Sequence, residues 1–282
     1  MTGGDSEMRN EGFLKYDLHT HTSLCGGRDT HEQMVHEAIK RGMHSIGFSE
    51  HSRISVLPNR GMRQEDEDFY RKEIERLRIV YGDQIHIFRG IEQDYYSDLP
   101  PLGYDYVIGS VHYLRVDGIL CPVTGTAEEI RAIVKKHFGG DVFAFLRLYY
   151  QTVADLPRKT ACDVIGHFDL IANINAQEPF FRESDRFYLG YVFKALDALI
   201  EQDVIFEVNT KALVDPCRRM PNPSLSVLQY LSAASAKIML SSDAASSDEL
   251  MRGFIQAAHL CKTLGFGSAA IYTENGWGRV CR

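Results

Sequence analysis

The sequence predicts an α/β fold in which a parallel barrel forms a single domain. Short runs rich in apolar and β-branched residues alternate with longer stretches whose apolar residues have helical spacing. Seven or eight such units follow one another along the chain, as in a parallel barrel. The chain has 282 residues, a length at which α/β barrels routinely form one domain.

The expected strands are short and distributed along the whole chain. They cover residues 15–19, 45–49, 85–92, 106–112, 163–167, 204–209, 237–242 and 269–272. The first follows a polar segment, MTGGDSEMRNEG, which lacks the apolar core of a signal peptide. We therefore expect residues 1–14 to form a flexible tail, residues 15–282 to form the barrel domain, and the protein to be cytoplasmic.

Most of the stretches between these strands are expected to be helices. THEQMVHEAIKRG has Thr30 as an N-cap, Gln33 three residues later and Gly42 at its end. Further helices are expected over residues 65–81, 127–156, 184–202, 224–235 and 246–264. The segment 127–156 is long enough for two helices, or for one helix broken at FGGD.

Composition argues against several function classes. A net charge of −7 provides no basic surface for nucleic acid. No apolar run reaches the roughly 20 residues needed to cross a bilayer. The six cysteines are scattered without a C-x-x-C pair, so we expect reduced thiols. The oligomeric state is left open.

Histidines and carboxylates follow the ends of the expected strands. KYDLHTHTS places His19 and His21 two residues apart, so in a strand both side chains project to the same face. A barrel gathers the carboxyl ends of its strands on one face, where enzyme sites of this architecture lie. The residues that meet there would be His19, His21, His51, Glu92, His112, His167 and Asp243.

This mixture of side chains indicates a metal centre. Imidazoles and carboxylates together suit Zn, Mn or Fe, and a carboxylate such as Glu92 can bridge two ions. The alternative is a set of hydrogen-bonded polar residues at loop mouths. Clustering of five histidines with two acids at successive strand ends favours the metal centre.

Seven motifs in order along the chain resemble the polymerase and histidinol phosphatase (PHP) family. They are DLHTHT, SEH, GIEQDY, IGSVHY, IGHFDL, FEVNT and SSDA, and they extend from about residue 15 to residue 264. The nearest branch is the stand-alone histidinol-phosphatase type. The resemblance implies a distorted (β/α)7 TIM-like barrel with metal ions at the carboxyl-terminal rim of the strands.

The resemblance also implies a ligand set and a metal-bridging hydroxide as nucleophile. The first ion would take His19, His21, Glu92 and Asp243, and the second would take Glu92, His112 and His167. His51 and Asp243 are the expected catalytic residues, with His51 as a hydrogen-bond donor or general acid to the leaving group. Asp17 is expected to orient a histidine from outside the ligand set.

Two positions depart from the three-metal members of this family. Where a third ion would take two further histidines, this chain has Gly27 and Ala245. We therefore expect two divalent ions and not three, with Mg as a further candidate beside Zn, Mn and Fe.

The expected function is that of a metal-dependent phosphomonoesterase acting on a small phosphate ester, with L-histidinol phosphate as the substrate that the resemblance favours. Lys211, Arg218 and Arg219 could supply positive charge for the phosphate dianion, or could simply be solvated surface cations. Two further hypotheses are another small phosphate substrate, and a non-catalytic paralogue that binds metal or ligand without turnover.

Overall fold

The computed structural model describes residues 12–57, 60–176 and 179–281. Within these residues, seven strands form one sheet in the order β1-β2-β3-β4-β7-β8-β9, and every neighbouring pair is parallel. Their bounds are β1 (Tyr16–Asp17), β2 (Ser45–Phe48), β3 (His86–Asp94), β4 (Tyr106–Ser110), β7 (Val164–Ile165), β8 (Ile205–Asn209) and β9 (Lys237–Ser241).

The sheet curves until its last strand approaches its first. Beyond β1 and β9 a parallel bridge joins Thr20 to Ala244, and the backbone N–H of His21 donates to the carbonyl of Ala244 at 2.8 Å. The carboxylate of Asp17 accepts hydrogen bonds from the backbone and hydroxyl of Ser242. The sheet is therefore a nearly closed barrel, which confirms the predicted distorted seven-stranded barrel.

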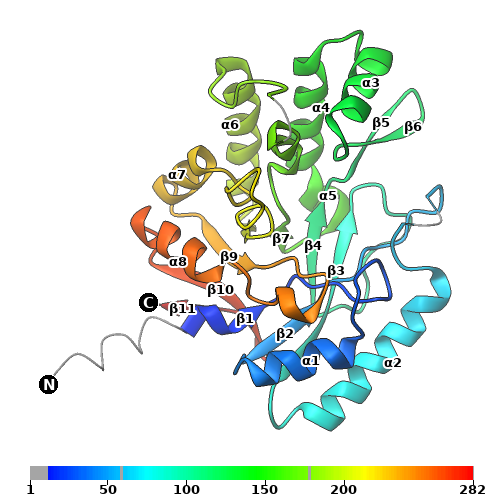
Figure 1. Cartoon of the computed structure of the whole chain (residues 1–282), viewed down its shortest axis with the longest axis vertical. Coiled ribbons are helices and arrows are strands. Elements are labelled where there is room, and N and C mark those ends of the chain that lie inside the picture. Colours follow the sequence, from blue (N-terminus) through cyan, green and yellow to red (C-terminus); the bar gives the residue numbers. More distant parts are fainter. Residues whose placement is uncertain (1–11, 58–59, 177–178, 282) are drawn as a thin grey trace, which may run out of the picture.

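Helices pack around the outside of this barrel. They are α1 (His31–Lys40), α2 (Gln64–Tyr81), α3 (Ala127–Phe138), α4 (Val142–Ala154), α5 (Leu156–Thr160), α6 (Arg186–Ile200), α7 (Leu225–Ala233) and α8 (Phe254–Thr263). Figure 1 shows α1 and α2 together at one end of the view and α3, α4 and α6 together at the other. Short 3-10 turns cover Gly12–Lys15, Leu170–Ala176 and Ser247–Glu249.

Local sequence signals explain where these helices begin and end. Thr30 and Gln33 form a reciprocal capping box at the start of α1, and Gly42 follows its end with φ +67°. The predicted helix over residues 127–156 is divided into α3 and α4 because Gly139 and Gly140 both adopt positive φ, at 61° and 87°. Asp141 then caps α4 through the backbone of Phe143.

The barrel interior is filled around Tyr106 of β4. Its hydroxyl donates to the carbonyl of Leu18 at 2.5 Å, on the far side of β2 and β3. A Cβ at Gly47 or Gly90 would lie 2.2 Å from this tyrosine, so glycine in β2 and β3 makes room for the ring. The tyrosine side chain thus fills the interior of the barrel near the amino-terminal ends of the strands.

Two hairpins depart from the predicted order of elements. Residues 269–272, expected as another strand of the barrel, lie in β10 (Ser268–Thr273), which pairs antiparallel with β11 (Gly276–Cys281) in a separate hairpin. A second hairpin, β5 (Tyr113–Val116) with β6 (Ile119–Pro122), follows β4 and was not predicted.

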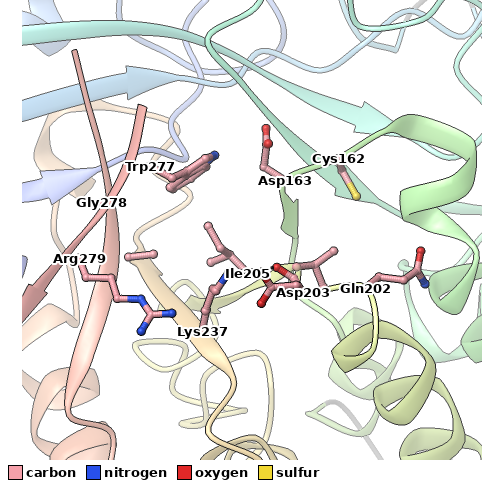
Figure 2. Close-up of a pocket in the computed structure, with 11 residues that line it drawn as sticks. Cys162, Asp163, Gln202, Asp203, Ile205, Lys237, Trp277, Gly278 and Arg279 are labelled. Carbon is pink, nitrogen blue, oxygen red and sulfur yellow. Dashed lines mark hydrogen bonds and ion pairs between the residues drawn. The ribbon is translucent and has the colours of Figure 1, made fainter. Parts of the chain in front are cut away.

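The β10–β11 hairpin covers the amino-terminal end of the barrel. Its Tyr272 and Trp277 pack against the interior cluster that contains Tyr106. Figure 2 shows Arg279 beside Lys237, and Trp277 apart from them beyond Ile205, around a cavity of about 340 Å³ at the starts of β7, β8 and β9. This cavity lies at the end of the strands opposite to the histidines.

The predicted tail falls almost entirely outside the described residues. Residues 1–11 are not described, and residues 12–14 belong to the 3-10 turn Gly12–Lys15. None of the described helices is long and apolar enough to cross a membrane.

Candidate metal centre

The carboxyl-terminal ends of the barrel strands bring seven polar side chains together. Because neighbouring strands are parallel, residues that end or follow them meet at one mouth of the barrel. Glu92 lies within β3, while the other six lie in the segments that directly follow β1, β2, β4, β7 and β9. The full set is His19, His21, His51, Glu92, His112, His167 and Asp243.

Glu92 lies in the middle of this set and is 1% exposed. Its Oε2 atom lies 3.4 Å from Nε2 of both His19 and His21, and 2.7 Å from Nδ1 of His51. His21 Nε2 in turn lies 3.6 Å from Oδ1 of Asp243. One oxygen of the carboxylate therefore faces His19, His21 and His51. The ligand atoms of His19, His21 and Asp243, called the first group below, lie within 4.8 Å of one another, and so do those of His21, His51 and Glu92.

The other oxygen of Glu92 faces a second group. Oε1 lies 2.8 Å from Nε2 of His167 and 3.3 Å from Nε2 of His112. It also accepts a hydrogen bond from the Ser110 hydroxyl at 2.7 Å. The ligand atoms of Glu92, His112 and His167 all lie within 4.8 Å of one another, which is close enough for one ion to contact all three.

The chemistry of these groups fits divalent cations. Glu92 Oε2 and His167 Nδ1 are buried and make no hydrogen bond of favourable geometry to any described residue. Burial alone would raise the pKa of Glu92, but the imidazoles of His51 and His112 hold it well below its usual range. An ionised, buried carboxylate surrounded by imidazole nitrogens is the donor set that Zn, Mn and Fe prefer.

Hydrogen-bond partners outside the two groups fix the histidine rings. His19 Nδ1 donates to Oε1 of Glu207 at 2.5 Å, and Nδ1 of His112 donates to Oδ2 of Asp94 at 3.2 Å. Such carboxylate partners set which ring nitrogen faces a metal. Sequence reasoning missed both of these acidic partners. Glu207 has one signal in the sequence: it lies two residues before Asn209 in the same strand, so these two polar side chains project to the same face of the strand.

Asp17, which was predicted to orient a histidine, has other hydrogen-bond partners among the described residues. Its carboxylate accepts hydrogen bonds from the Ser242 backbone at 3.1 Å, the Ser242 hydroxyl at 2.5 Å and the Met251 backbone at 3.1 Å. Asp17 lies two residues before His19, and its carboxylate points to the end of β9. It therefore ties the barrel closed, while Glu207 contacts the histidine.

Backbone atoms fill the space around Gly27 and Ala245, the two positions at which a third ion would need histidines. A Cβ on Gly27 would lie 2.7 Å from the carbonyl oxygen of His21 and 2.9 Å from that of Ala245. Arg28 N–H donates to the same Ala245 carbonyl at 2.7 Å. The loops that carry positions 27 and 245 are thus in direct contact, with no space between them for an imidazole.

Two lobes of a cavity open beside the two ligand groups, with volumes of about 780 and 610 Å³. Both are lined by His51, Glu92, His112 and Lys211. His51 is the most exposed of the seven clustered side chains, at 36%, and its ring stacks on His21 with centroids 4.3 Å apart. His51 therefore lies where a substrate entering either lobe would meet the centre.

The three predicted phosphate-binding cations lie in different surroundings. Lys211 Nζ lies 2.8 Å from Oδ1 of Asp243, and this carboxylate raises the pKa of the lysine. Arg218 lines the second lobe and pairs with both oxygens of Glu183, at 2.5 and 3.1 Å. Arg219 is exposed and lines neither lobe. Only two of the three cations are therefore placed to meet a ligand at the centre.

Comparison with known proteins gives a consistent match. Residues 17–211 match the family model described as "PHP domain". A histidinol-phosphatase of Bacillus subtilis is 28% identical over 227 residues, which cover 71% of this chain and 81% of that protein.

Two solved structures share the fold. A Listeria monocytogenes protein described as a candidate histidinol phosphatase superposes with a TM-score of 0.72 and 20% identity, covering 86% of this chain and 99% of that one. The histidinol phosphate phosphatase of Lactococcus lactis subsp. lactis, complexed with zinc, L-histidinol and phosphate, gives a TM-score of 0.65 and 22% identity. That match covers 94% of this chain and 99% of that one.

Proposed function

This chain belongs to the PHP domain family, and we propose that it is a metal-dependent phosphomonoesterase that hydrolyses a small phosphate ester. The observation that carries the proposal is the position of Glu92, whose two oxygens face two separate groups of ligand atoms. A carboxylate between two metal positions is the arrangement used in two-metal phosphatases.

The proposal assigns two divalent ions to the centre. His19, His21 and Asp243 would hold one, His112 and His167 would hold the other, and Glu92 would contribute one oxygen to each. When bound, such ions lower the pKa of a water molecule toward neutrality and offset the negative charge of the phosphoryl group. Zinc is the first ion to test because it is the one named with the Lactococcus lactis structure.

The chain's own residues bind the substrate and move its protons. The ammonium of Lys211 lies at the edge of the centre and would bind a phosphate oxygen while keeping its contact with Asp243. His51, exposed to both lobes, would donate a proton to the leaving alkoxide. Arg218 would bind the substrate from the second lobe through the guanidinium N–H groups that its ion pair with Glu183 does not use.

L-histidinol phosphate is the substrate that we propose. The Bacillus subtilis relative is named histidinol-phosphatase, and the Lactococcus lactis structure contains L-histidinol and phosphate. The two lobes beside the centre offer separate spaces for the phosphate and for the organic part of such an ester.

The test is phosphate release by the full chain reconstituted with Zn or Mn, measured on L-histidinol phosphate and a panel of other phosphomonoesters. The matched control is His112→Ala, checked for folding by circular dichroism. We expect the highest kcat/KM on L-histidinol phosphate and none in the variant. A higher kcat/KM on another ester would identify that ester as the substrate instead. If the chain binds the ester but does not hydrolyse it with any metal, the protein is a non-catalytic binding protein and not an enzyme.

A further inference from the structure

Glu207 occupies an unusual position between the two groups of ligand atoms. It lies in the middle of β8 and is completely buried. Oε1 accepts from Nδ1 of His19 and from the hydroxyl of Ser241, both at 2.5 Å. Oε2 accepts from the backbone N–H of His167, also at 2.5 Å. Both oxygens of one carboxylate therefore accept hydrogen bonds, from residues at the ends of three strands, β1, β7 and β9.

The two histidines that Glu207 contacts belong to different groups. His19 faces Glu92 Oε2 with the first group, while His167 faces Glu92 Oε1 with the second. Glu92 lines the cavity and contacts histidines of both groups there. Glu207 contacts one histidine of each group on the side away from the cavity. The two carboxylates thus enclose the histidines from opposite sides.

The contact with His167 acts on the backbone and not on the ring. His167 has a φ of +23°, a conformation that non-glycine residues rarely adopt. A residue in such a region costs about 1–3 kcal/mol unless its surroundings hold it there. The hydrogen bond from its N–H to a buried carboxylate is one of the contacts that hold it, and this backbone sets where the imidazole points.

We propose that Glu207 is a positioning residue that couples the two ion sites, because one carboxylate sets the ring of His19 and the backbone of His167 together. The inference rests on the two-ion centre of the proposed function. The hydrogen bonds to the two oxygens of Glu207 come from N–H and O–H donors, as suits an ionised carboxylate, which is an acceptor only.

Asp94 provides a matched control because it contacts one group only. Its Oδ2 accepts from the backbone N–H of His112 at 3.0 Å and from Nδ1 of the same residue at 3.2 Å. Removing its charge should disturb the second group and leave the first unchanged. Removing the charge of Glu207 should disturb both, since the amide of a glutamine can accept from one partner but presents N–H groups to the other.

The experiment is a metal titration of the metal-free full chain. Wild type, Glu207→Gln, Glu207→Asp and Asp94→Asn are titrated with Co²⁺, followed by visible absorbance, and with Zn²⁺, followed by calorimetry. Loss of an outer partner weakens metal binding by about 10–100-fold. We expect both affinities to fall by this factor in Glu207→Gln, and only one in Asp94→Asn.

Glu207→Asp guards against a variant that does not fold. It keeps the charge, but its carboxylate is withdrawn from both partners by one methylene, so both affinities should fall here too. Circular dichroism of each metal-free variant establishes that it is folded. The inference is overturned if a folded Glu207 variant changes one affinity only, or neither.

The outcomes separate this inference from the proposed function. A wild-type chain that binds fewer than two ions would refute the two-ion centre itself. A chain that binds two ions, with only one weakened in the Glu207 variants, would refute the coupling alone. Two coupled ions without phosphate release would refute the activity and leave the coupling in place.

Discussion

A single methyl group added at Gly27 should destabilise the protein strongly. Built on the present backbone, the Cβ of Gly27→Ala lies 2.7 Å from the carbonyl oxygen of His21, 2.8 Å from the carbonyl carbon of Thr22 and 2.9 Å from the carbonyl oxygen of Ala245. These are backbone atoms, so no side-chain rotation can relieve the overlap. One of the two loops must move.

The magnitude follows from what that movement breaks. Extra atoms in a well-packed region cost about 1–3 kcal/mol. Separating the loops also disturbs two hydrogen bonds, from Gly27 N–H to Thr22 O at 2.8 Å and from Arg28 N–H to Ala245 O at 2.7 Å. Each is worth about 1 kcal/mol. After the gain of about 0.4–1 kcal/mol from a stiffer unfolded chain, we expect a net loss of about 3 kcal/mol in the free energy of unfolding.

Urea unfolding of the metal-free protein, followed by circular dichroism, measures this loss. Gly190→Ala is the matched control, because Gly190 lies in α6 and a Cβ added there would meet no other atom within 4 Å. There the same substitution should stabilise the protein by about 0.5–1 kcal/mol. The two variants add the same methyl group, at one position against three close backbone atoms and at the other on a helix with no atom within 4 Å.

A loss of less than about 1 kcal/mol in Gly27→Ala would refute the reasoning, since overpacking alone should exceed it. The same packing predicts that a double variant, Gly27→His with Ala245→His, binds no third ion. Three Zn ions per chain in that variant, measured by atomic emission, would show that the loops separate more easily than their contacts indicate.

Four further outcomes are expected. His112→Ala should lower kcat by more than about 100-fold, since even an outer partner of a ligand contributes about 10–100-fold; steady-state phosphate release checks this, and wild-type turnover would contradict it. A hydrogen bond to a charged group is worth about 1.5–3 kcal/mol, so Lys211→Met should raise KM for the ester about 10-fold or more, and an unchanged KM would exclude Lys211 from phosphate binding. Chelation should lower the melting temperature by roughly 8 °C or more relative to protein in excess Zn, and equal temperatures would argue against a bound ion. Arg218→Ala should reduce the free energy of unfolding by about 2 kcal/mol because it removes the charged partner of the partly buried Glu183, which keeps a hydrogen bond from the amide of Asn175; Glu183→Gln is the control for the pair.

The fold was predictable wherever local pattern and chain order agree. Most barrel strands are short apolar runs followed by a helix, and a parallel strand order then follows from the chain. The β10–β11 hairpin was not predictable in this way, because residues 268–273 have the same apolar pattern as a barrel strand. Only pairing with β11, the next segment, separates them from the sheet.

The candidate site was predictable to the extent that it depends on strand ends. His19, His112 and Asp243 directly follow strands, so their meeting follows from the barrel alone. Partners within strands require the direction of each side chain, which short strands of uncertain register do not reveal. Glu207 was missed for this reason, and Asp17 was given the orienting role because it lies two residues before His19 in the sequence.

The β10–β11 hairpin also provides an intrinsic fluorescence probe, Trp277. Trp277 is the single tryptophan of the chain, and it packs 5.1 Å from Tyr272 and 6.0 Å from Tyr106 between ring centroids. Its emission therefore reports on the end of the barrel that is remote from the histidines. Cobalt absorbance reports on the other end, so one sample carries two independent signals. If tryptophan emission and cobalt absorbance change together during unfolding, the two ends of the barrel unfold in a single cooperative transition.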